Sequence, residues 1–356
     1  MTTREWLEDR LGLAAIREVA SHKTVPVHSA THWYYFGGIT LFLFGVQILT
    51  GILLLFYYRP TVAESFESVK FIMTRVEFGW LIRSVHSWSA NLMIFMAFVH
   101  MFSVVFTHAY RAPRELTWAS GIALLALLMT FGFSGYLLPW NQIAYFATKV
   151  GTDVAASTPL IGEMLGRILR GGEAVGAATL TRFFALHVMV LTLATVGLIV
   201  FHILLVQKNG MSTPPKLDEN TVKRMPFFPN FFLRELMVWY GTLAVLGALA
   251  AIFPWEVGEK ADPFSSAPAG IRPEWYFLAE FYTLQLIPGH VGPIEGELLG
   301  LLGFALLGVG WALLPVWGVT KSGQAKTRLT SGAAIFLIAY LIVFSILGYY
   351  KLGYYK

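Results

Sequence analysis

Four histidines stand inside two stretches of sequence that are otherwise apolar enough to cross a membrane. Residues 83–110 contain His86 and His100, fourteen positions apart, and residues 181–207 contain His187 and His202, fifteen positions apart. At about 100° per residue, fourteen positions fall about 40° short of four helical turns and fifteen pass them by about 60°. Each pair therefore shares one face of its helix, with about 21 Å of rise between the two rings, and the four imidazoles lie at two depths.

Neutral imidazole is an axial ligand of haem iron, and a haem held between two helices needs one histidine from each helix at the same depth. Two helices with two histidines each have the ligands for two haems. A single histidine in a membrane helix is about as often a packing residue or a proton relay. Two nearly equal spacings favour the two-haem interpretation over that alternative.

The composition places the chain in a membrane. Of its 356 residues, 56% are hydrophobic and only 13% are charged, which is typical of a polytopic membrane protein and not of a soluble globular one. The absence of cysteine excludes disulfides, thiolate metal sites and thioether-linked haem within the chain, so any haem is expected to be non-covalent. The formal charge of +5 is scattered over loops without interleaved aromatic residues, and we expect no nucleic-acid partner.

The hydrophobic segments predict an all-α polytopic membrane protein with seven transmembrane helices, the first four forming a two-haem bundle. The predicted spans are residues 33–57, 80–106, 115–138, 181–207, 236–254, 294–318 and 331–350. Residues 1–23 alternate charged and apolar positions, which predicts an amphipathic helix on the membrane surface. We therefore divide the chain into two parts. Residues 1–210 comprise the N-terminal helix and the four-helix di-haem bundle, and residues 211–356 form a three-helix part.

The charges of the short loops predict the orientation. Residues 107–114 and 319–330 are basic and contain no acidic residue, so the positive-inside rule places them in the cytoplasm, with the N-terminus and the 208–234 loop on the same side. The second and fourth spans then run in the same direction. His86 is expected to face His187 near the outer side, and His100 to face His202 near the cytoplasmic side.

Glycines repeat the histidine spacing in the other two helices of the predicted bundle. Gly37 and Gly51 are fourteen apart in the first span, as are Gly121 and Gly135 in the third. A flat macrocycle needs neighbouring helices that carry no side chain at its level, although glycine is also common wherever membrane helices pack closely. Two arginines near the span ends, Arg83 and Arg114, are suited to pairing with haem propionates, or alternatively to snorkelling at the interface.

Two long connections on the outer side, residues 140–179 and 255–292, are expected to carry function, because such loops are uncommon unless they bind or catalyse. The second contains the run Pro273, Glu274, Trp275, Tyr276. A carboxylate between a fixed turn and two aromatic rings can have a raised pKa and accept a proton. The alternative is a carboxylate that complements the dipole at a helix N-terminus.

Several motifs together make the chain resemble cytochrome b of the quinol:cytochrome c oxidoreductase family over essentially its whole length. Up to about residue 210 it is similar to the chloroplast-type protein of the cytochrome bf complex, and from "ADPF" through "PEWYF" to subunit four of that complex, here fused to the haem-bearing part. The motifs of the first part are "YYRPTVAESF", "FGWLIRSVHSWSA", "PRELTW", "GYLLPW" and "TLTRFFALH". The fifteen-residue step between His187 and His202 is also of the chloroplast type.

The resemblance implies roles for these residues. His86 and His187 would ligate the low-potential haem, and His100 and His202 the high-potential haem. Glu274 would act in quinol oxidation in an outer pocket that also involves Tyr136, Pro139, Trp140, Pro273, Trp275 and Tyr276. The implied partners are quinone, a Rieske iron-sulfur protein and a c-type cytochrome, in a homodimer, and we expect the bacterial plasma membrane as the location.

The chain departs from the chloroplast pattern on the cytoplasmic side. Tyr35 stands where that family has the cysteine that attaches an extra haem, and Ser87 and Gln207 replace arginines that usually lie beside the haems. The groups expected at a cytoplasmic quinone site are Lys208, Asn230, Arg234 and Glu235.

Two other classes of function are compatible with parts of the pattern. A transporter that relays protons through its histidines and Glu274 would be colourless. A two-haem anchor subunit of a dehydrogenase or hydrogenase would contain haem but no outer quinol pocket, and the 273–276 run argues against it.

Overall fold

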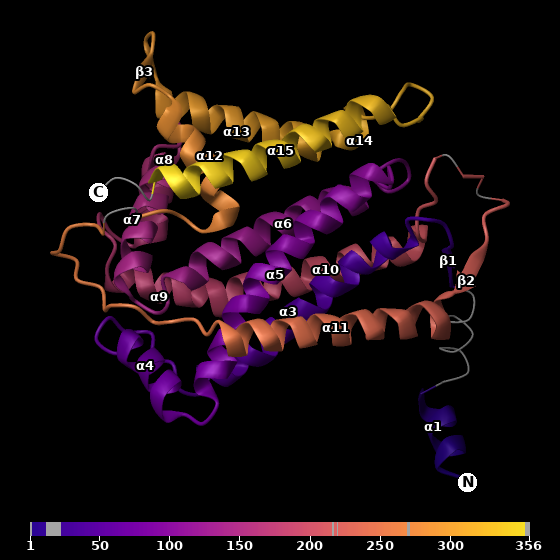
Figure 1. Cartoon of the computed structure of the whole chain (residues 1–356), viewed down its shortest axis with the longest axis horizontal. Coiled ribbons are helices and arrows are strands. Elements are labelled where there is room, and N and C mark those ends of the chain that lie inside the picture. The colour runs from indigo at the N-terminus through magenta and orange to yellow at the C-terminus, as the bar shows by residue number, and fades with distance from the viewer. Residues whose placement is uncertain (1, 12–22, 216, 219, 269–270, 353–356) are drawn as a thin grey trace.

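The computed structural model describes residues 2–11, 23–215, 217–218, 220–268 and 271–352 and is mostly helical (Figure 1). Its helices are α1 (Thr3–Leu11), α3 (Tyr35–Leu55), α4 (Ser65–Arg75), α5 (Gly79–Phe106), α6 (Glu115–Tyr136), α7 (Gln142–Ala156), α8 (Gly162–Arg170), α9 (Ala177–Ala185), α10 (Leu191–Asn209), α11 (Phe232–Ile252), α12 (Trp275–Leu286), α13 (Gly296–Ala312), α14 (Leu314–Trp317) and α15 (Thr327–Leu352). Three short helical turns, η1 (Thr31–Tyr34), η2 (Leu186–Val190) and η3 (Phe227–Phe231), adjoin α3, α10 and α11. Two small antiparallel strand pairs are present in the described residues. The strands β1 (Thr24–Pro26) and β2 (Arg224–Pro226) are distant in sequence, whereas β3 (His290–Val291) and β4 (Ile294–Glu295) form a short hairpin.

Six helical segments are long and apolar enough to cross a membrane, and they confirm the all-α membrane fold. They are Thr31–Leu55, Gly79–Phe106, Glu115–Tyr136, Ala177–Asn209, Phe227–Ile252 and Thr327–Leu352. The remaining predicted span, residues 294–318, corresponds to α13, a shorter apolar helix of 17 residues, and α14 follows it after Leu313. The span predicted from residue 236 begins earlier, because α11 starts at Phe232 and the turn η3 precedes it from Phe227, with a kink at Phe228.

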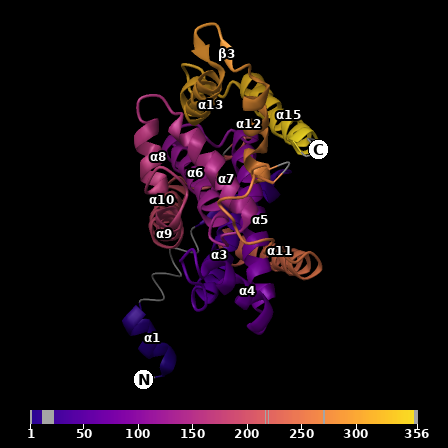
Figure 2. The same ribbon diagram turned by 90° about the vertical axis from the view of Figure 1, so that its left-hand side faces the viewer.

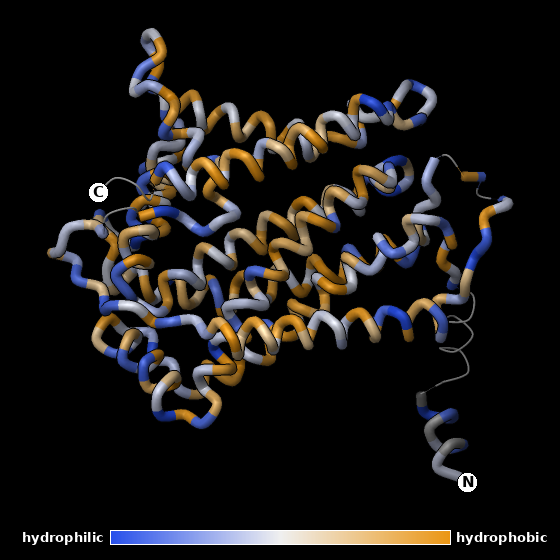
Figure 3. Tube along the Cα trace, in the orientation of Figure 1, coloured by the Kyte–Doolittle hydropathy of each residue, from blue (hydrophilic) through white to orange (hydrophobic). Residues whose placement is uncertain are grey.

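The first four long helices form a bundle, with α3 packed along α5 and α6 packed along α10. Helix α11 lies against α3 and α5, while α12 packs against α15 and α13 at the other side of α5 and α6 (Figures 1 and 2). Large apolar side chains such as Leu193, Leu306 and Phe336 point outward and are exposed. Apolar residues run along the whole length of these helices (Figure 3), as a lipid-facing surface requires.

The basic loops gather at one end of the bundle. Tyr110, after α5, donates its hydroxyl to Gly318 O at 3.3 Å, and Arg114 Nη2 donates to Asn209 O at 3.0 Å. Strand β1 pairs antiparallel with β2 at the same end, which ties the N-terminal part to the start of the C-terminal part (Figure 1). The loops predicted to share one side of the membrane therefore do lie together.

The two long loops meet at the opposite end. Asn141 Nδ2 donates to Val257 O at 2.7 Å, and the backbone N–H of Gln142 donates to Glu259 O at 2.9 Å. Residues 140–179, predicted as short surface helices, form α7, α8 and the start of α9. The helix before them ends at Tyr136, and Leu137 to Pro139 make the turn into this region.

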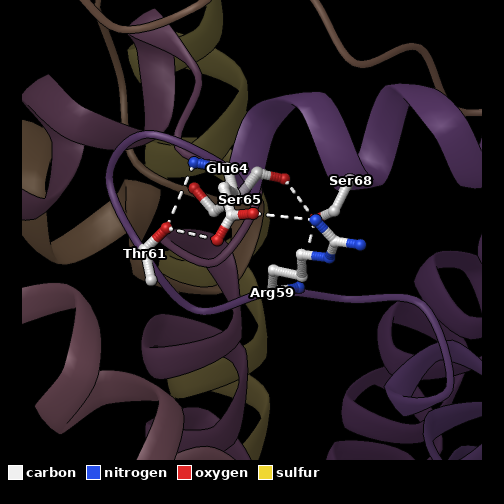
Figure 4. A network of polar contacts seen from close by, with 5 residues as sticks. All are labelled: Arg59, Thr61, Glu64, Ser65 and Ser68. Carbon is white, nitrogen blue, oxygen red and sulfur yellow. Dashed lines mark hydrogen bonds and ion pairs between the residues drawn. The ribbon is translucent and has the colours of Figure 1, made fainter.

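The connection between α3 and α4 lies at this same end and is ordered by polar contacts around one carboxylate (Figure 4). Glu64 accepts from Arg59 Nη1 at 2.8 Å and from Thr61 Oγ1 at 3.2 Å, while the backbone N–H of Arg59 donates to Ser68 Oγ at 3.2 Å. The ion pair is exposed and contributes little to stability by itself. Its role is to hold the turn that delivers the chain into α4.

The N-terminal helix is shorter in the described residues than predicted. Helix α1 covers Thr3–Leu11, and residues 12–22 lie outside the described part of the chain. Arg10 lies 4.9 Å from the centre of the exposed Trp6 ring.

Close approach of backbone at the start of α5 generates a stability prediction. A Cβ atom at Gly79 would lie 2.0 Å from Ile72 O, whereas a Cβ atom at Gly241 in α11 would meet nothing within 4 Å. Gly79→Ala should lower the free energy of unfolding by about 1–3 kcal/mol through overpacking. The control Gly241→Ala should be neutral or raise it by up to about 1 kcal/mol through helix propensity. Thermal unfolding of both variants in detergent checks this, and equal midpoints would contradict it.

Candidate functional site

The four histidines lie where the two-depth argument predicts, inside the bundle. His86 and His100 are on α5, His187 is in η2, and His202 is on α10. The ring centres of His86 and His187 are 6.4 Å apart. Two imidazoles that share one metal through Nε2 have centres about 6 Å apart, because each metal–nitrogen bond is about 2 Å and the nitrogen lies about 1 Å from its ring centre. His100 and His202 likewise lie within electrostatic range of each other.

A π-helical turn explains how a fifteen-residue step matches a fourteen-residue one. η2 spans Leu186–Val190, and the hydroxyl of Thr192 reaches back five residues to donate to His187 O at 3.2 Å. A π-turn closes an i→i+5 hydrogen bond and so takes in one more residue than an α-turn. The π-turn accommodates the extra residue between His187 and His202. Both rings therefore stay on the same side of the η2–α10 helix, the side that faces α5.

Each of the four spaced glycines faces one of the four histidines. A Cβ atom at Gly51 would lie 3.5 Å from His86 Cε1, and one at Gly135 would lie 2.6 Å from His187 Cε1. At the other level, Gly37 faces His100 at 3.1 Å and Gly121 faces His202 at 3.4 Å, measured in the same way. A Cβ atom would clash with the imidazole at Gly135 and would be tight at Gly37, whereas at Gly51 and Gly121 it would make an ordinary van der Waals contact.

A hydroxyl residue precedes three of these glycines and fixes the neighbouring imidazole. Nδ1 of His86 lies 2.8 Å from Thr50 Oγ1, and Nδ1 of His202 lies 2.8 Å from Ser120 Oγ. Ser134 Oγ is 3.2 Å from His187 Nδ1. Each hydroxyl donates its own hydrogen to a carbonyl oxygen of its helix, of Val46, Thr117 and Phe131 respectively. The oxygen is thus left to accept from Nδ1–H, which leaves the lone pair of Nε2 free to bind a metal.

His100 is the exception among the four. The residue before its glycine is Phe36, and His100 Nδ1 is buried with no hydrogen-bond partner among the described residues. The two levels of the bundle therefore differ in how their imidazoles are held.

A cavity of about 560 Å³ opens at the level of His86 and His187. Its walls include Gly51, His86, Gly135, His187 and Arg83, and its size falls within the usual range for cofactor sites. Arg83 Nη1 also donates to Trp255 O at 2.7 Å. Paired imidazoles with free Nε2 atoms, glycines on both flanks and this volume fit a flat iron macrocycle. No group of three or more His, Asp or Glu residues suited to a bare metal ion occurs in the part of the chain that the structure describes.

A second, smaller cavity of about 320 Å³ adjoins the first. Tyr136, Glu274 and Tyr276 line both, so these three side chains form the wall between the two cavities. The rest of the smaller cavity is mainly apolar, with Pro273 from the loop and side chains of α7, α12 and α13. It suits a ring with an apolar tail that needs a few polar contacts.

Glu274 is the residue directly before α12, at the N-terminal end of that helix. Burial raises the pKa of its carboxyl group above the usual range. The carboxyl group is therefore suited to taking up a proton from a ligand in the smaller cavity.

The other residues predicted at the quinol pocket do not lie together: one lines the larger cavity and two line neither cavity. Pro139 lines the larger cavity, while Trp140 is 1% exposed and packs against Tyr145 inside the cluster of the outer loops. Trp275 lines neither cavity and donates from Nε1 to Asn91 Oδ1 at 2.9 Å. Arg114 precedes α6 and holds the end of α10.

Several residues that position the site were not predicted. Thr50, Ser120 and Ser134 were missed, although each directly precedes a predicted glycine. Gly132 was missed too, and a Cβ atom there would lie 2.1 Å from the hydroxyl of Tyr276. This glycine lets Tyr276 of α12 reach the face of α6.

The end of the bundle that carries the basic loops brings some of the remaining predicted groups together. Tyr35 stacks on Phe231 with ring centres 4.7 Å apart, and the guanidinium group of Arg234 lies beside the Tyr35 hydroxyl. Glu235 is buried, with its carboxyl group packed over Gly38, next to the glycine that faces His100. Lys208 is exposed, and Asn230 lies in η3.

Comparison with known proteins agrees with this geometry. Residues 21–210 match the family described as cytochrome b/b6/petB, and residues 260–353 match cytochrome b(C-terminal)/b6/petD. The chain belongs to the cytochrome b family. The recognised resemblance is thus confirmed for both of its parts.

Individual relatives extend the match over nearly the whole chain. A cytochrome bc complex cytochrome b subunit of Chlorobaculum thiosulfatiphilum is 46% identical over 341 residues, 95% of this chain and 78% of the relative. Cytochrome b6 of Auxenochlorella protothecoides is 49% identical over 210 residues, 59% of this chain and 97% of that protein. A chain of a solved hyperthermophilic respiratory complex III superposes with a TM-score of 0.85 at 29% identity, covering 98% of this chain and 93% of that one.

Family membership places the chain among the b-haem-binding cytochrome b subunits of bc-type complexes, as an integral membrane protein of electron transport with an oxidoreductase role. It favours the redox class over a transporter without haem.

Proposed function

We propose that this cytochrome b oxidises quinol at the outer face of the bacterial plasma membrane and conducts electrons across that membrane through two non-covalent b haems. Its turnover would contribute to the proton gradient. One observation carries the proposal. The smaller cavity, which the buried carboxyl group of Glu274 lines, shares Tyr136, Glu274 and Tyr276 with the larger cavity, which contains the facing pair His86 and His187.

The haem-binding residues are proposed as two sets. His86 and His187 would hold the outer haem between Gly51 and Gly135, with Arg83 beside it. His100 and His202 would hold the inner haem between Gly37 and Gly121, with Arg114 at the cytoplasmic end. When bound, each haem iron supplies a one-electron carrier.

The protein's own contribution is to hold these ligands in one tautomer at two depths. Hydroxyl groups accept from Nδ1–H of His86, His187 and His202 and so increase the electron donation of each ring to a metal. His100 lacks such a partner among the described residues. His100 and His202 together would therefore donate less electron density to a haem iron than His86 and His187 would. A haem held by His100 and His202 would then have the higher reduction potential, which favours inward movement of electrons against the membrane potential.

In the smaller cavity, Glu274 would accept a proton from a quinol hydroxyl group as general base. Burial raises the pKa of the Glu274 carboxyl group, so the group is neutral at acidic pH. Above that raised pKa it is ionised, and it is then a stronger base toward the quinol hydroxyl group than an exposed carboxylate. Pro273 fixes the turn before it, and apolar side chains of α7 and α13 exclude water from the ring.

The cluster of Tyr35, Arg234 and Glu235, assigned to the cytoplasmic side, is proposed as the site where quinone is reduced and protons are taken up. Lys208 and Asn230 lie along the same end. Partners of the complete enzyme would be a Rieske iron-sulfur protein and a c-type cytochrome, in a homodimer. Membership of a bc-type complex supports these partners, and the N-terminus and basic loops are assigned to the cytoplasm on their charge.

The pairing of histidines by depth can be tested on the purified complex. Replacing His100 or His202 by a non-ligating residue should remove one and the same haem component, that of higher potential. Replacing His86 or His187 should remove the other. Redox-titrated visible spectra measure both. Loss of the same component from the His86 and His202 variants, with the other spared, would show that the assigned pairing is wrong.

Glu274→Gln keeps the shape of the side chain and removes its titration. Quinol:cytochrome c turnover should fall about 100-fold, in the range that general bases contribute, while both haem spectra stay unchanged. In the parent complex turnover should rise with pH through the raised pKa of Glu274, since a base acts only when deprotonated, and the variant should lose this rise. Undiminished turnover at every pH would leave Glu274 with only a helix-terminus role.

A third prediction concerns the mode of haem attachment. A thioether bond needs a thiol, the chain contains no cysteine, and Tyr35 occupies the matching position. Extraction with acidified acetone should therefore remove all haem from this chain, with two b haems recovered in the extract. A denaturing gel stained for haem peroxidase activity provides the check, and a haem-stained band at the mass of this chain would refute non-covalent binding.

A further inference from the structure

A second buried carboxyl group lines the smaller cavity. Glu280 lies on α12, six residues after Glu274, and contributes to the wall of the 320 Å³ cavity but not to that of the larger one. Its Oε2 atom is buried and has no hydrogen-bond partner among the described residues. A buried carboxyl oxygen without a partner is costly, so the position calls for a donor that the chain itself does not supply.

The surroundings of Glu280 limit what that donor can be. The walls from α7 and α13 are apolar, with Val150, Val154, Leu301 and Phe304. The cation nearest in sequence, Arg272, stacks on Tyr349 at 3.8 Å and donates to Tyr349 O at 3.0 Å. Its guanidinium is therefore already bonded at the end of α15. An apolar pocket with an unused carboxyl oxygen suits a ligand that combines an apolar body with a hydroxyl group.

The two carboxyl groups are spaced along the cavity. Six residues of helix rise by about 9 Å. Glu274 marks the side next to the larger cavity because it lines both, and Glu280 lies farther along α12. A quinol carries its two hydroxyl groups at opposite ends of the ring, and two carboxyl groups that line different parts of one cavity offer a proton acceptor for each of them.

We propose that Glu280 accepts the proton of the second quinol hydroxyl group, while Glu274 accepts that of the first. In this step the O–H bond of the quinol breaks, an O–H bond forms on the Glu280 carboxylate, and the negative charge passes to the quinol oxygen. Glu280 gains and loses no electron. The inference rests on the proposed function, whose two one-electron acceptors, a b haem and a Rieske cluster, take the electrons of the ring.

The charged and titratable groups around Glu280 are consistent with a proton acceptor. Tyr340 of α15 faces it and shares a 2.7 Å hydrogen bond with Thr283 of α12. The other titratable groups of the cavity are Tyr136 of α6, Glu274, Tyr276 and Arg272, and α7 and α13 add none to its wall. Burial raises the pKa of Glu280, and a backbone hydrogen bond opposes this in part.

The test uses the complete purified complex with duroquinol as donor and cytochrome c as acceptor. Glu280→Gln should lower kcat about tenfold or more with a smaller change in KM, and should flatten the rise of turnover with pH, because a group that acts as base is lost. Glu280→Asp should restore a pH-dependent rise at an intermediate rate. Glu297→Gln, on the exposed first turn of α13 and outside the cavity, is the matched control and should behave as the parent. Unchanged haem spectra show that each variant is folded.

The outcomes separate this inference from the proposed function. If Glu274→Gln is slow while Glu280→Gln keeps the parent kcat and pH profile, Glu280 is a packing residue and the proposed function stands. If the parent complex has intact haem spectra and oxidises no quinol, both are wrong. Should Glu280→Gln fail to assemble, the aspartate variant decides: a displaced pH profile supports the proposal, and a parent-like profile overturns it.

Discussion

An imidazole nitrogen inside hydrocarbon is costly without a partner, and the bundle avoids this cost at Nδ1 of three of the four site histidines, His100 being the exception. A buried polar atom without a partner costs about 1–3 kcal/mol. Residues of α3 and α6 avoid the cost by placing a hydroxyl at one nitrogen and a glycine beside the ring, at Thr50–Gly51, Ser120–Gly121 and Ser134–Gly135. The other nitrogen is left for a metal. The close approach of α3 to α5 and of α6 to α10 follows from these small residues.

The wall between the two cavities is the second organising feature. Tyr136 comes from α6, and Glu274 and Tyr276 come from the start of α12, so the wall exists only when the C-terminal part is docked on the bundle. Gly132 permits that docking, because any side chain there would displace the Tyr276 hydroxyl. A ligand in the smaller cavity is thus separated from the His86–His187 pair by single side chains, without intervening secondary structure.

The sequence predicted those features that repeat along one helix. Hydropathy located the spans, and spacing located the histidines and glycines, because both depend on local periodicity. Features that depend on contact between distant segments were missed. Ser120 and Ser134 look like ordinary small residues until His202 and His187 lie opposite them, and Glu280 is unremarkable until α13 covers it. Trp140, predicted at the pocket, packs in the loop cluster because the turn after α6 carries it away from the cavity. The π-turn at His187 could not be predicted from a period that assumes uniform α-helix.

The pairing of β1 with β2 also bears on chain continuity. Val25 lies opposite Met225, so the polypeptide entering the first span is hydrogen-bonded to the polypeptide entering α11. Together with the packing of α11 on α3 and α5, this pairing joins the two parts without the peptide link across residues 211–223. A chain cut in that stretch would still carry its own means of reassembly, and cytochrome b6 relatives that align over 210 residues are nearly complete at that point. The strand pair therefore holds the two parts together close to the point where the covalent linker also joins them.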